Sequence, residues 1–92
     1  MKISKQKREK ISEQVLAYLY SQNPKSLFAS YIALEIARDE EFIKKILLDL
    51  KKKSLVIEIK KNSKGIDYKR RSRWKLTDNA YESYKKAQNS KI

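Results

Sequence analysis

The hydrophobic pattern of the chain changes its period near residue 55, and this change constrains the fold more than any other feature. Before it, apolar residues recur every three or four positions, which is the spacing of one helix face. After it, Leu55, Ile57 and Ile59 alternate with other residues, which is the spacing of a β-strand. A chain of 92 residues has room for one modest core. We therefore expect residues 1–92 to form a single α+β domain.

Two helices are expected first. One spans about residues 4–22 and ends before Pro24, because the residue before a proline is pushed away from helical angles. A short segment at residues 27–28 can be extended. The second helix is expected over about residues 30–37, with Ser30 as its N-cap.

A third helix, expected over about residues 40–53, has clear signals at both ends. Asp39 is a good N-cap, while Glu40 and Glu41 suit the positive end of the helix dipole and the lysines at 51–53 suit its negative end. Each helix has an apolar stripe that is expected to face the core. The stripes are Ile11, Val15, Tyr18 and Gln22 beside Leu19, then Ile32, Ala33 and Ile36, and finally Ile43, Ile46, Leu47 and Leu50.

The alternating segment predicts a two-stranded wing over about residues 55–76, followed by a last helix over about 78–91. The turn is expected at residues 62–65, because the one glycine of the chain lies there. Thr77 or Asp78 caps the last helix. The return strand has one face of Tyr68, Arg70, Ser72, Trp74 and Leu76 and another of Lys69, Arg71, Arg73 and Lys75. The apolar stripe of the last helix contains Ala80, Tyr81, Tyr84 and Ala87.

The charge of the chain is large and unevenly distributed. The net charge is +12, from 23 Lys and Arg against 11 Asp and Glu. Residues 51–76 hold eleven of the basic side chains, opposed only by Glu58 and Asp67. A surplus of this size indicates a polyanionic partner, which is DNA, RNA or an acidic membrane surface.

The residue types that are absent exclude several kinds of chemistry. The chain has no Cys and no His, so it lacks thiolate metal ligands, disulfides and the commonest general base. We therefore expect no enzyme, no metal, no cofactor and no small-molecule substrate. Its apolar runs are too short to span a bilayer, so no membrane partner is expected and a cytoplasmic location is the default.

Two stretches resemble the winged helix-turn-helix family. In the first, Ile32, Ala33 and Ile36 precede Ile43, Leu47 and Leu50, and Leu55-Val56 follows at once, as in the two-helix unit and first strand of that family. The second, Trp74-Lys75-Leu76-Thr77, resembles the end of the family's wing. The resemblance covers residues 8–90 and extends to small regulators of archaea, their viruses and plasmids. It implies that the third helix enters the major groove and that the wing lies along the backbone or in the minor groove.

Two positions differ from the family pattern. Ser54 stands where the family usually has Gly, so the corner between helix and strand is built differently. The recognition helix begins with Asp39, Glu40 and Glu41, where the family carries Ser, Thr, Gln or Arg. One interpretation is capping of the helix dipole, and the other is that Glu40 or Glu41 accepts a hydrogen bond from cytosine N4.

The candidate DNA-binding residues lie on two elements. On the recognition helix they are Glu41, Phe42, Lys44, Lys45, Leu48 and Lys52. On the wing they are Lys60, Lys61, Lys64, Lys69, Arg70, Arg71, Arg73 and Lys75. The alternatives are a solvated helix face and lysines that protect a strand edge. A smaller basic cluster contains Lys5, Lys7, Arg8 and Lys10 and is either a backbone contact or a charged terminus. Trp74, Tyr81 and Tyr84 have the spacing of core residues rather than of a base-stacking surface.

These patterns predict a protein that binds double-stranded DNA, and a transcription regulator in particular. A homodimer is compatible with this function, because palindromic sites require two-fold proteins. Two alternatives stay open, namely an RNA-binding or ribosome-associated winged helix and a winged helix that binds other proteins.

Overall fold

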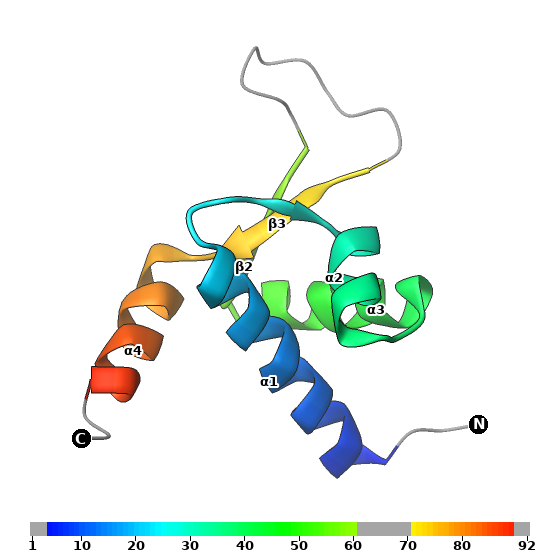
Figure 1. The fold of residues 1–92 in the computed structure, drawn as a ribbon, viewed down its shortest axis with the longest axis horizontal. Helices are drawn as coiled ribbons and strands as arrows, with labels where there is room; N and C mark the ends of the chain where they lie inside the picture. The colour runs from blue at the N-terminus through cyan, green and yellow to red at the C-terminus, as the bar shows by residue number, and fades with distance from the viewer. Residues whose placement is uncertain (1–3, 61–70, 90–92) are drawn as a thin grey trace.

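The computed structural model describes residues 4–60 and 71–89 of the chain, and within these ranges it confirms the α+β fold (Figure 1). Four helices surround a small antiparallel sheet. In chain order the elements are α1 (Lys5–Gln22), β1 (Leu27–Phe28), α2 (Ala29–Ile36), α3 (Glu40–Lys52), β2 (Val56–Ile59), β3 (Arg73–Leu76) and α4 (Asp78–Asn89). The expected turn at residues 62–65 and the side chain of Tyr68 lie outside the described residues.

Side-chain caps mark where three of the helices begin. Ser4 Oγ accepts a hydrogen bond from the Lys7 amide at 3.2 Å and begins α1. Asp39 Oδ2 accepts from the Phe42 amide at 3.1 Å, which confirms the expected N-cap of α3. Thr77 Oγ1 accepts from the amide of residue 80 at 3.1 Å, so Thr77 rather than its neighbour caps α4.

The prediction that Ser30 caps α2 is wrong. The helix begins at Ala29, one residue earlier, and the cap position falls on Phe28, which makes no side-chain cap. The reason is tertiary, because Phe28 belongs to β1 and pairs with Arg73 of β3, so the strand continues directly into the helix. The helix ends at Ile36, and Ala37 follows in the left-handed conformation.

The sheet has three strands in the order β1-β3-β2. The expected two-stranded wing, β2 and β3, is therefore extended by β1, which pairs with the other edge of β3. Leu27 pairs with Trp74 on one side of β3, while Val56 and Leu76 pair on the other. Trp74 and Leu76 are buried, which confirms the apolar face expected for the return strand. Ile57 points the other way and is 41 % exposed.

One hydrophobic core holds the sheet against α1, α2 and α3. All four residues of the stripe expected on α3 are buried. On α1 the buried residues are Ile11, Val15 and Leu19, which are four positions apart. Tyr18 and Gln22, which belong to the expected stripe, are only half-buried. Burial removes about 25 cal/mol of unfavourable hydration per Å² of apolar surface, and this is the main term that fixes the wing strands on the helices.

Ser54 forms the corner between α3 and β2 with a φ of 61°, in the left-handed region where the resembled family has Gly. Its carbonyl accepts a hydrogen bond from Thr77 Oγ1 at 3.0 Å. A non-glycine residue rarely adopts this conformation without support from its surroundings. The hydrogen bond supplies such support and links the corner to the start of α4.

Candidate nucleic-acid interface

The outer face of α3 carries most of the side chains that the sequence assigned to the recognition helix. Glu41, Lys44, Lys45 and Lys52 are exposed, and Leu48 is 48 % exposed. Phe42 differs from them, because its side chain is half-buried and packs against the core. The helix therefore presents a face of mixed charge with one exposed Leu near its middle.

Acidic side chains at the start of α3 form ion pairs with Lys44 of the same helix. Lys44 Nζ lies 3.4 Å from Glu41 Oε1 and 3.5 Å from Glu40 Oε2. Contact with Glu41, and then with Glu40, raises the pKa of the Lys44 ammonium above its ordinary value. Asp39 serves as the N-cap, so two of the three acids balance a neighbouring lysine and the third caps the start of the helix. This arrangement supports the capping interpretation, whereas acceptance from cytosine stays a prediction.

The described part of the wing presents basic side chains on the sheet face away from Trp74. Arg73 and Lys75 alternate with buried residues along β3, whereas Arg71 precedes the strand and lines a cavity together with Trp74. The Phe28 ring lies beneath two of these cations, 4.9 Å from the Arg73 guanidinium carbon and 5.9 Å from that of Arg71. Tyr31 stacks on the same ring at 6.4 Å between centroids. An aromatic face attracts a cation, so Phe28 fixes where these arginines lie.

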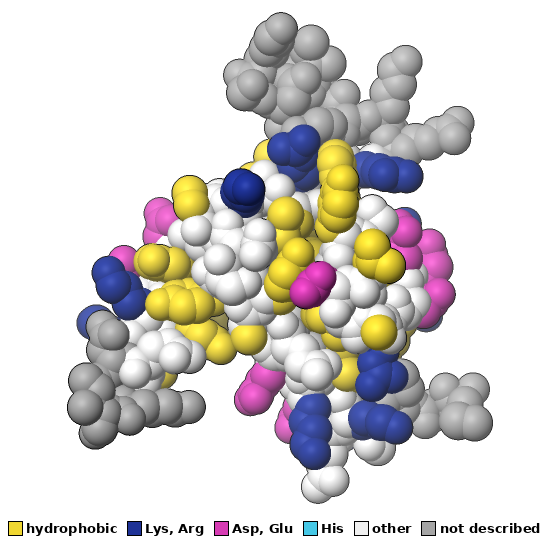
Figure 2. Space-filling model, in the orientation of Figure 1, with side chains coloured by type: hydrophobic (Ala, Val, Ile, Leu, Met, Phe, Trp, Pro, Cys, Tyr) yellow, Lys and Arg dark blue, Asp and Glu magenta, His cyan; other side chains and the backbone are white. Residues whose placement is uncertain are grey.

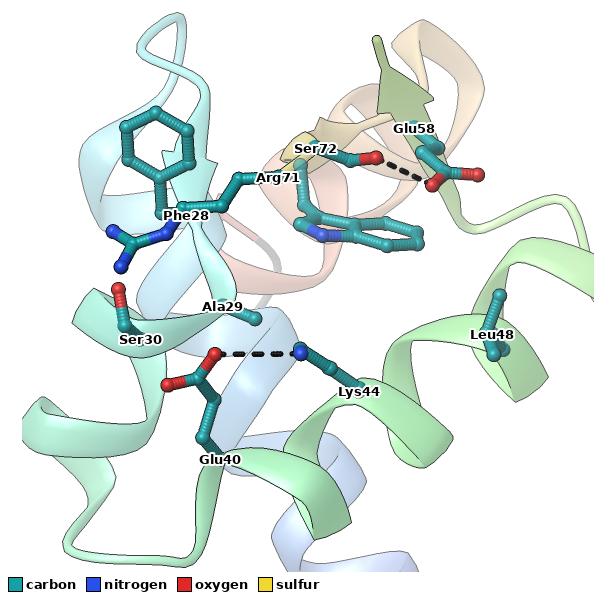
Figure 3. A pocket seen from close by; sticks show the side chains of 10 residues that line it. Phe28, Ala29, Ser30, Glu40, Lys44, Leu48, Glu58, Arg71 and Ser72 are labelled. Atoms are coloured by element: carbon teal, nitrogen blue, oxygen red, sulfur yellow. Dashed lines mark hydrogen bonds and ion pairs between the residues drawn. The ribbon is translucent and has the colours of Figure 1, made fainter. Parts of the chain in front are cut away.

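A cavity of about 230 Å³ joins the two candidate elements (Figure 3). Its walls include Lys44 and Leu48 from α3, Arg71 and Ser72 from the approach to β3, and Ser30 from the first turn of α2. In Figure 3 the Arg71 side chain extends from the wing toward Phe28 and Ser30. Residues predicted on the recognition helix and on the wing therefore lie on one continuous surface.

Glu58 is a residue of this surface that the sequence did not assign to it. Its side chain is only 13 % exposed, and its two oxygens bind different elements. Lys51 Nζ donates to Oε1 at 2.8 Å, and Ser72 Oγ donates to Oε2 at 2.6 Å. Burial alone raises the pKa of this carboxyl, but the hydrogen bonds from Lys51 and Ser72 outweigh burial and lower it below its ordinary value. Its position as one of two acids in a basic stretch was the available signal.

The remaining predicted residues divide into two groups. Lys60 is exposed at the end of β2. Four predicted wing residues lie outside the described part of the chain, namely Lys61, Lys64, Lys69 and Arg70. The basic cluster of the N-terminus lies on the first turns of α1, where Lys5, Lys7 and Lys10 are exposed and Arg8 is half-buried.

The described aromatic residues of the second half, Trp74, Tyr81 and Tyr84, are structural. Trp74 is 4 % exposed inside the core. The Tyr20 ring lies 5.2 Å from that of Tyr81 and 4.5 Å from that of Tyr84, so these rings join α1 to α4. They are not arranged as an open surface for stacking bases.

Charge is unevenly spread over the visible face of the molecule, with a few acidic side chains scattered over its centre and left side (Figure 2). Basic side chains gather at the upper end, over the base of the wing, and hydrophobic surface lies directly beside them. Acidic side chains gather on the side where α2 and α3 meet. A second basic group lies over the first turns of α1. The base of the wing is therefore the part of this face that attracts a polyanion most strongly.

Two kinds of feature are absent from the described ranges, 4–60 and 71–89. None of the helices there combines the length and the hydropathy that a bilayer crossing requires. In the same ranges, His, Cys, Asp and Glu form no group of three that could hold a metal ion.

Solved structures with the same fold include DNA-bound proteins. The MepR–DNA complex of S. aureus matches with a TM-score of 0.69 and 20 % identity, over 87 % of this chain and 64 % of that one. The Lactococcus lactis protein ZitR matches with a TM-score of 0.68 and 19 % identity, over 97 % and 56 %. The Zalpha domain of Carassius auratus PKZ, in complex with Z-DNA, matches with a TM-score of 0.58 and 23 % identity, over 76 % and 97 %.

These likenesses establish a winged-helix fold. The chain spans about two thirds or less of the MepR and ZitR chains, so it corresponds to one part of those proteins. No model of a protein family matches the sequence, and neither does any curated protein.

Proposed function

We propose that this protein binds double-stranded DNA through α3 and the wing and acts as a transcription regulator. One observation carries the proposal, namely the single surface on which Lys44 and Leu48 of α3 meet Arg71 and Ser72 of the wing around a shared cavity. In the proposed complex α3 enters the major groove, while the wing follows the backbone or the adjacent minor groove.

The distribution of charge suggests different contacts for the two elements, phosphate contacts for the wing and base contacts for α3. Arg71 and Lys75 form no ion pair with an acid of the described chain, so both are available to phosphates. Phosphate contacts supply most of the affinity and carry no sequence information. Base-edge contacts fall to the exposed face of α3, where Lys45 suits guanine and Leu48 suits the thymine methyl group.

The solved neighbours support the proposal through what they bind. MepR has been solved on DNA, and the Zalpha domain on Z-DNA. A homodimer of this chain would place two copies of the surface on the two halves of an inverted repeat.

A selection experiment tests the proposal directly. The full chain is titrated with a random pool of duplex DNA at about 50 and 200 mM salt, and the retained molecules are sequenced. We expect affinity to fall steeply with salt, by about 0.9 in log K per log unit of salt for each neutralised phosphate. We also expect a defined motif to be enriched. An inverted repeat among the retained sequences would establish a dimer and its half-site spacing.

Competitors separate the alternatives. The first competitor is duplex RNA, because the narrow major groove of A-form RNA excludes a helix. The second competitor is a DNA duplex held in the left-handed form. Preference for RNA would replace the proposal by the ribosome-associated alternative. Absence of salt-dependent binding to any nucleic acid would overturn the proposal in favour of a winged helix that binds proteins.

A further inference from the structure

Glu58 has a position that its charge does not explain. Within the described parts of the wing, residues 56–60 and 71–76, it is the single acid among four basic side chains. A carboxylate beside a surface that binds phosphates lowers the affinity for them. Such a residue needs a role that offsets this cost.

The contacts of Glu58 join three segments of the chain. It lies opposite Trp74 in the register of β2 and β3, on the sheet face that covers the core. From there its carboxylate reaches Lys51 in the last turn of α3 at 2.8 Å. It also reaches Ser72 at 2.6 Å, one residue beyond the last pair of the register, Ile59 with Arg73. The recognition helix, the outgoing strand and the returning strand therefore meet at one side chain.

The same contacts also constrain the backbone next to Arg71. Ser72 lies next to Arg71 in the chain, and both line the cavity together with Lys44. When Glu58 holds Ser72, the backbone of the return strand has a defined distance from α3. That distance decides whether Arg71 and Lys44 address the same stretch of nucleic-acid backbone. Figure 3 shows the Glu58–Ser72 bond on the wing side of the cavity and the Glu40–Lys44 pair on the helix side.

The chain contains a comparable ion pair that lacks this connection. Asp49 Oδ2 lies 3.3 Å from Lys53 Nζ, at the same end of α3, with i,i+4 spacing. This pair lies within one helix and its immediate cap, and in the described part of the chain neither side chain forms an ion pair or a side-chain hydrogen bond with a strand. Asp49 is therefore a matched control for the charge of Glu58 and for the loss of a lysine partner.

We infer that Glu58 is a positioning residue, which holds the wing against α3 so that the cations of both elements bind one nucleic-acid backbone. The inference rests on the proposed function for its readout in binding. The structural part, which is the position of the wing, is testable without any nucleic acid.

The test compares Glu58→Ala with Asp49→Ala in the full chain. Each substitution removes one carboxylate and releases one lysine, so electrostatics alone predict equal and slightly tighter binding to duplex DNA. We expect Asp49→Ala to bind as tightly as the wild type or up to about threefold more tightly. We expect Glu58→Ala to bind about five- to tenfold more weakly, with a salt slope shallower by about 1, corresponding to roughly one lost phosphate contact. Both titrations are done where circular dichroism shows each variant folded.

Two further measurements separate positioning from a general loss of stability. In the Arg71→Ala background, Glu58→Ala is expected to cause no further loss of affinity, because the cation that it positions is gone. Glu58→Gln keeps an oxygen that accepts from Ser72 and is expected to restore at least half of the lost affinity on a logarithmic scale. Binding by Glu58→Ala equal to that of Asp49→Ala, or additive losses in the cycle, would overturn the inference.

The fluorescence of Trp74 reports the packing of the wing in the absence of DNA. Trp74 is the one tryptophan of the chain and lies opposite Glu58 in the sheet. We expect Glu58→Ala to increase quenching by acrylamide and Asp49→Ala to leave it unchanged. If the wild type binds no nucleic acid but this difference is present, the proposed function fails while Glu58 still positions the wing. Equal quenching in both variants would overturn the positioning role itself.

Discussion

The helix α3 and the described part of the wing have equal numbers of basic side chains, but these side chains have different partners. From Glu40 to Lys52 the helix has four basic and three acidic residues, and two of these acids bind Lys44. The described wing has four basic residues and one acid, Glu58, which binds Lys51 and Ser72 rather than an arginine. Under the proposed function, the wing is expected to supply sequence-independent affinity. The helix has a near-balanced charge and is expected to contribute selectivity.

The largest expected effect comes from Trp74, on which both regions depend. Trp74→Ala empties a core position that is 4 % exposed, and such truncations cost about 3–5 kcal/mol. This is a large share of the 5–15 kcal/mol that stabilises a typical domain. Urea titration followed by circular dichroism measures the loss. Ile57→Ala on the exposed side of the sheet is the control, and a loss below about 1 kcal/mol for Trp74→Ala would contradict the anchoring of the wing through this ring.

The next effect separates wing from helix. Arg71→Ala with Arg73→Ala is expected to weaken binding to every duplex by at least tenfold at about 0.1 M salt, and to reduce the salt slope by about 1.8. Lys85→Ala with Lys86→Ala removes the same charge from exposed positions of α4 and is expected to have little effect. Equal losses in the two double variants would mean that only the total charge matters.

A smaller effect, of opposite sign, is expected on the helix. Glu40→Gln with Glu41→Gln releases Lys44 from its two partners, so duplex affinity is expected to rise about two- to fivefold and the salt slope to steepen by about 0.9. Glu13→Gln with Glu82→Gln, at exposed sites of α1 and α4, is the charge-matched control. Weaker binding or a changed sequence motif after the first pair of substitutions would instead favour base contacts by these acids.

The smallest effect concerns pH and stability. The pKa of Glu58 is lower in the folded protein than its ordinary value of 4.5. Its ionised form therefore stabilises the fold above pH 4.5, and this contribution is lost as pH falls through the folded-state pKa. We expect the wild type to exceed Glu58→Gln by about 1 kcal/mol at neutral pH. The difference should shrink below about pH 4.5 in urea titrations, and a difference independent of pH would contradict the ion pair with Lys51.

The sequence by itself determined the order and the periods of the elements. The α3 stripe from Ile43 to Leu50, the cap at Asp39 and the alternation of the return strand over Arg73–Leu76 follow from local spacing and hydrogen-bonding chemistry, and the structure confirms them. Of the two cap candidates for the last helix, Thr77 and Asp78, the structure selects Thr77. These features depend on residues at most a few positions apart. Sequence periodicity reports such local relations well.

Only the tertiary structure decided the features that join distant segments. Phe28 takes the cap position of α2 because β1 pairs with β3, 45 residues further along the chain. Glu58 reaches Lys51 and Ser72, and Arg71 meets Lys44 at one cavity, because the sheet folds back over α3. Such contacts depend on strand register and on the packing of a shared core. Neither is encoded in the spacing of any single segment.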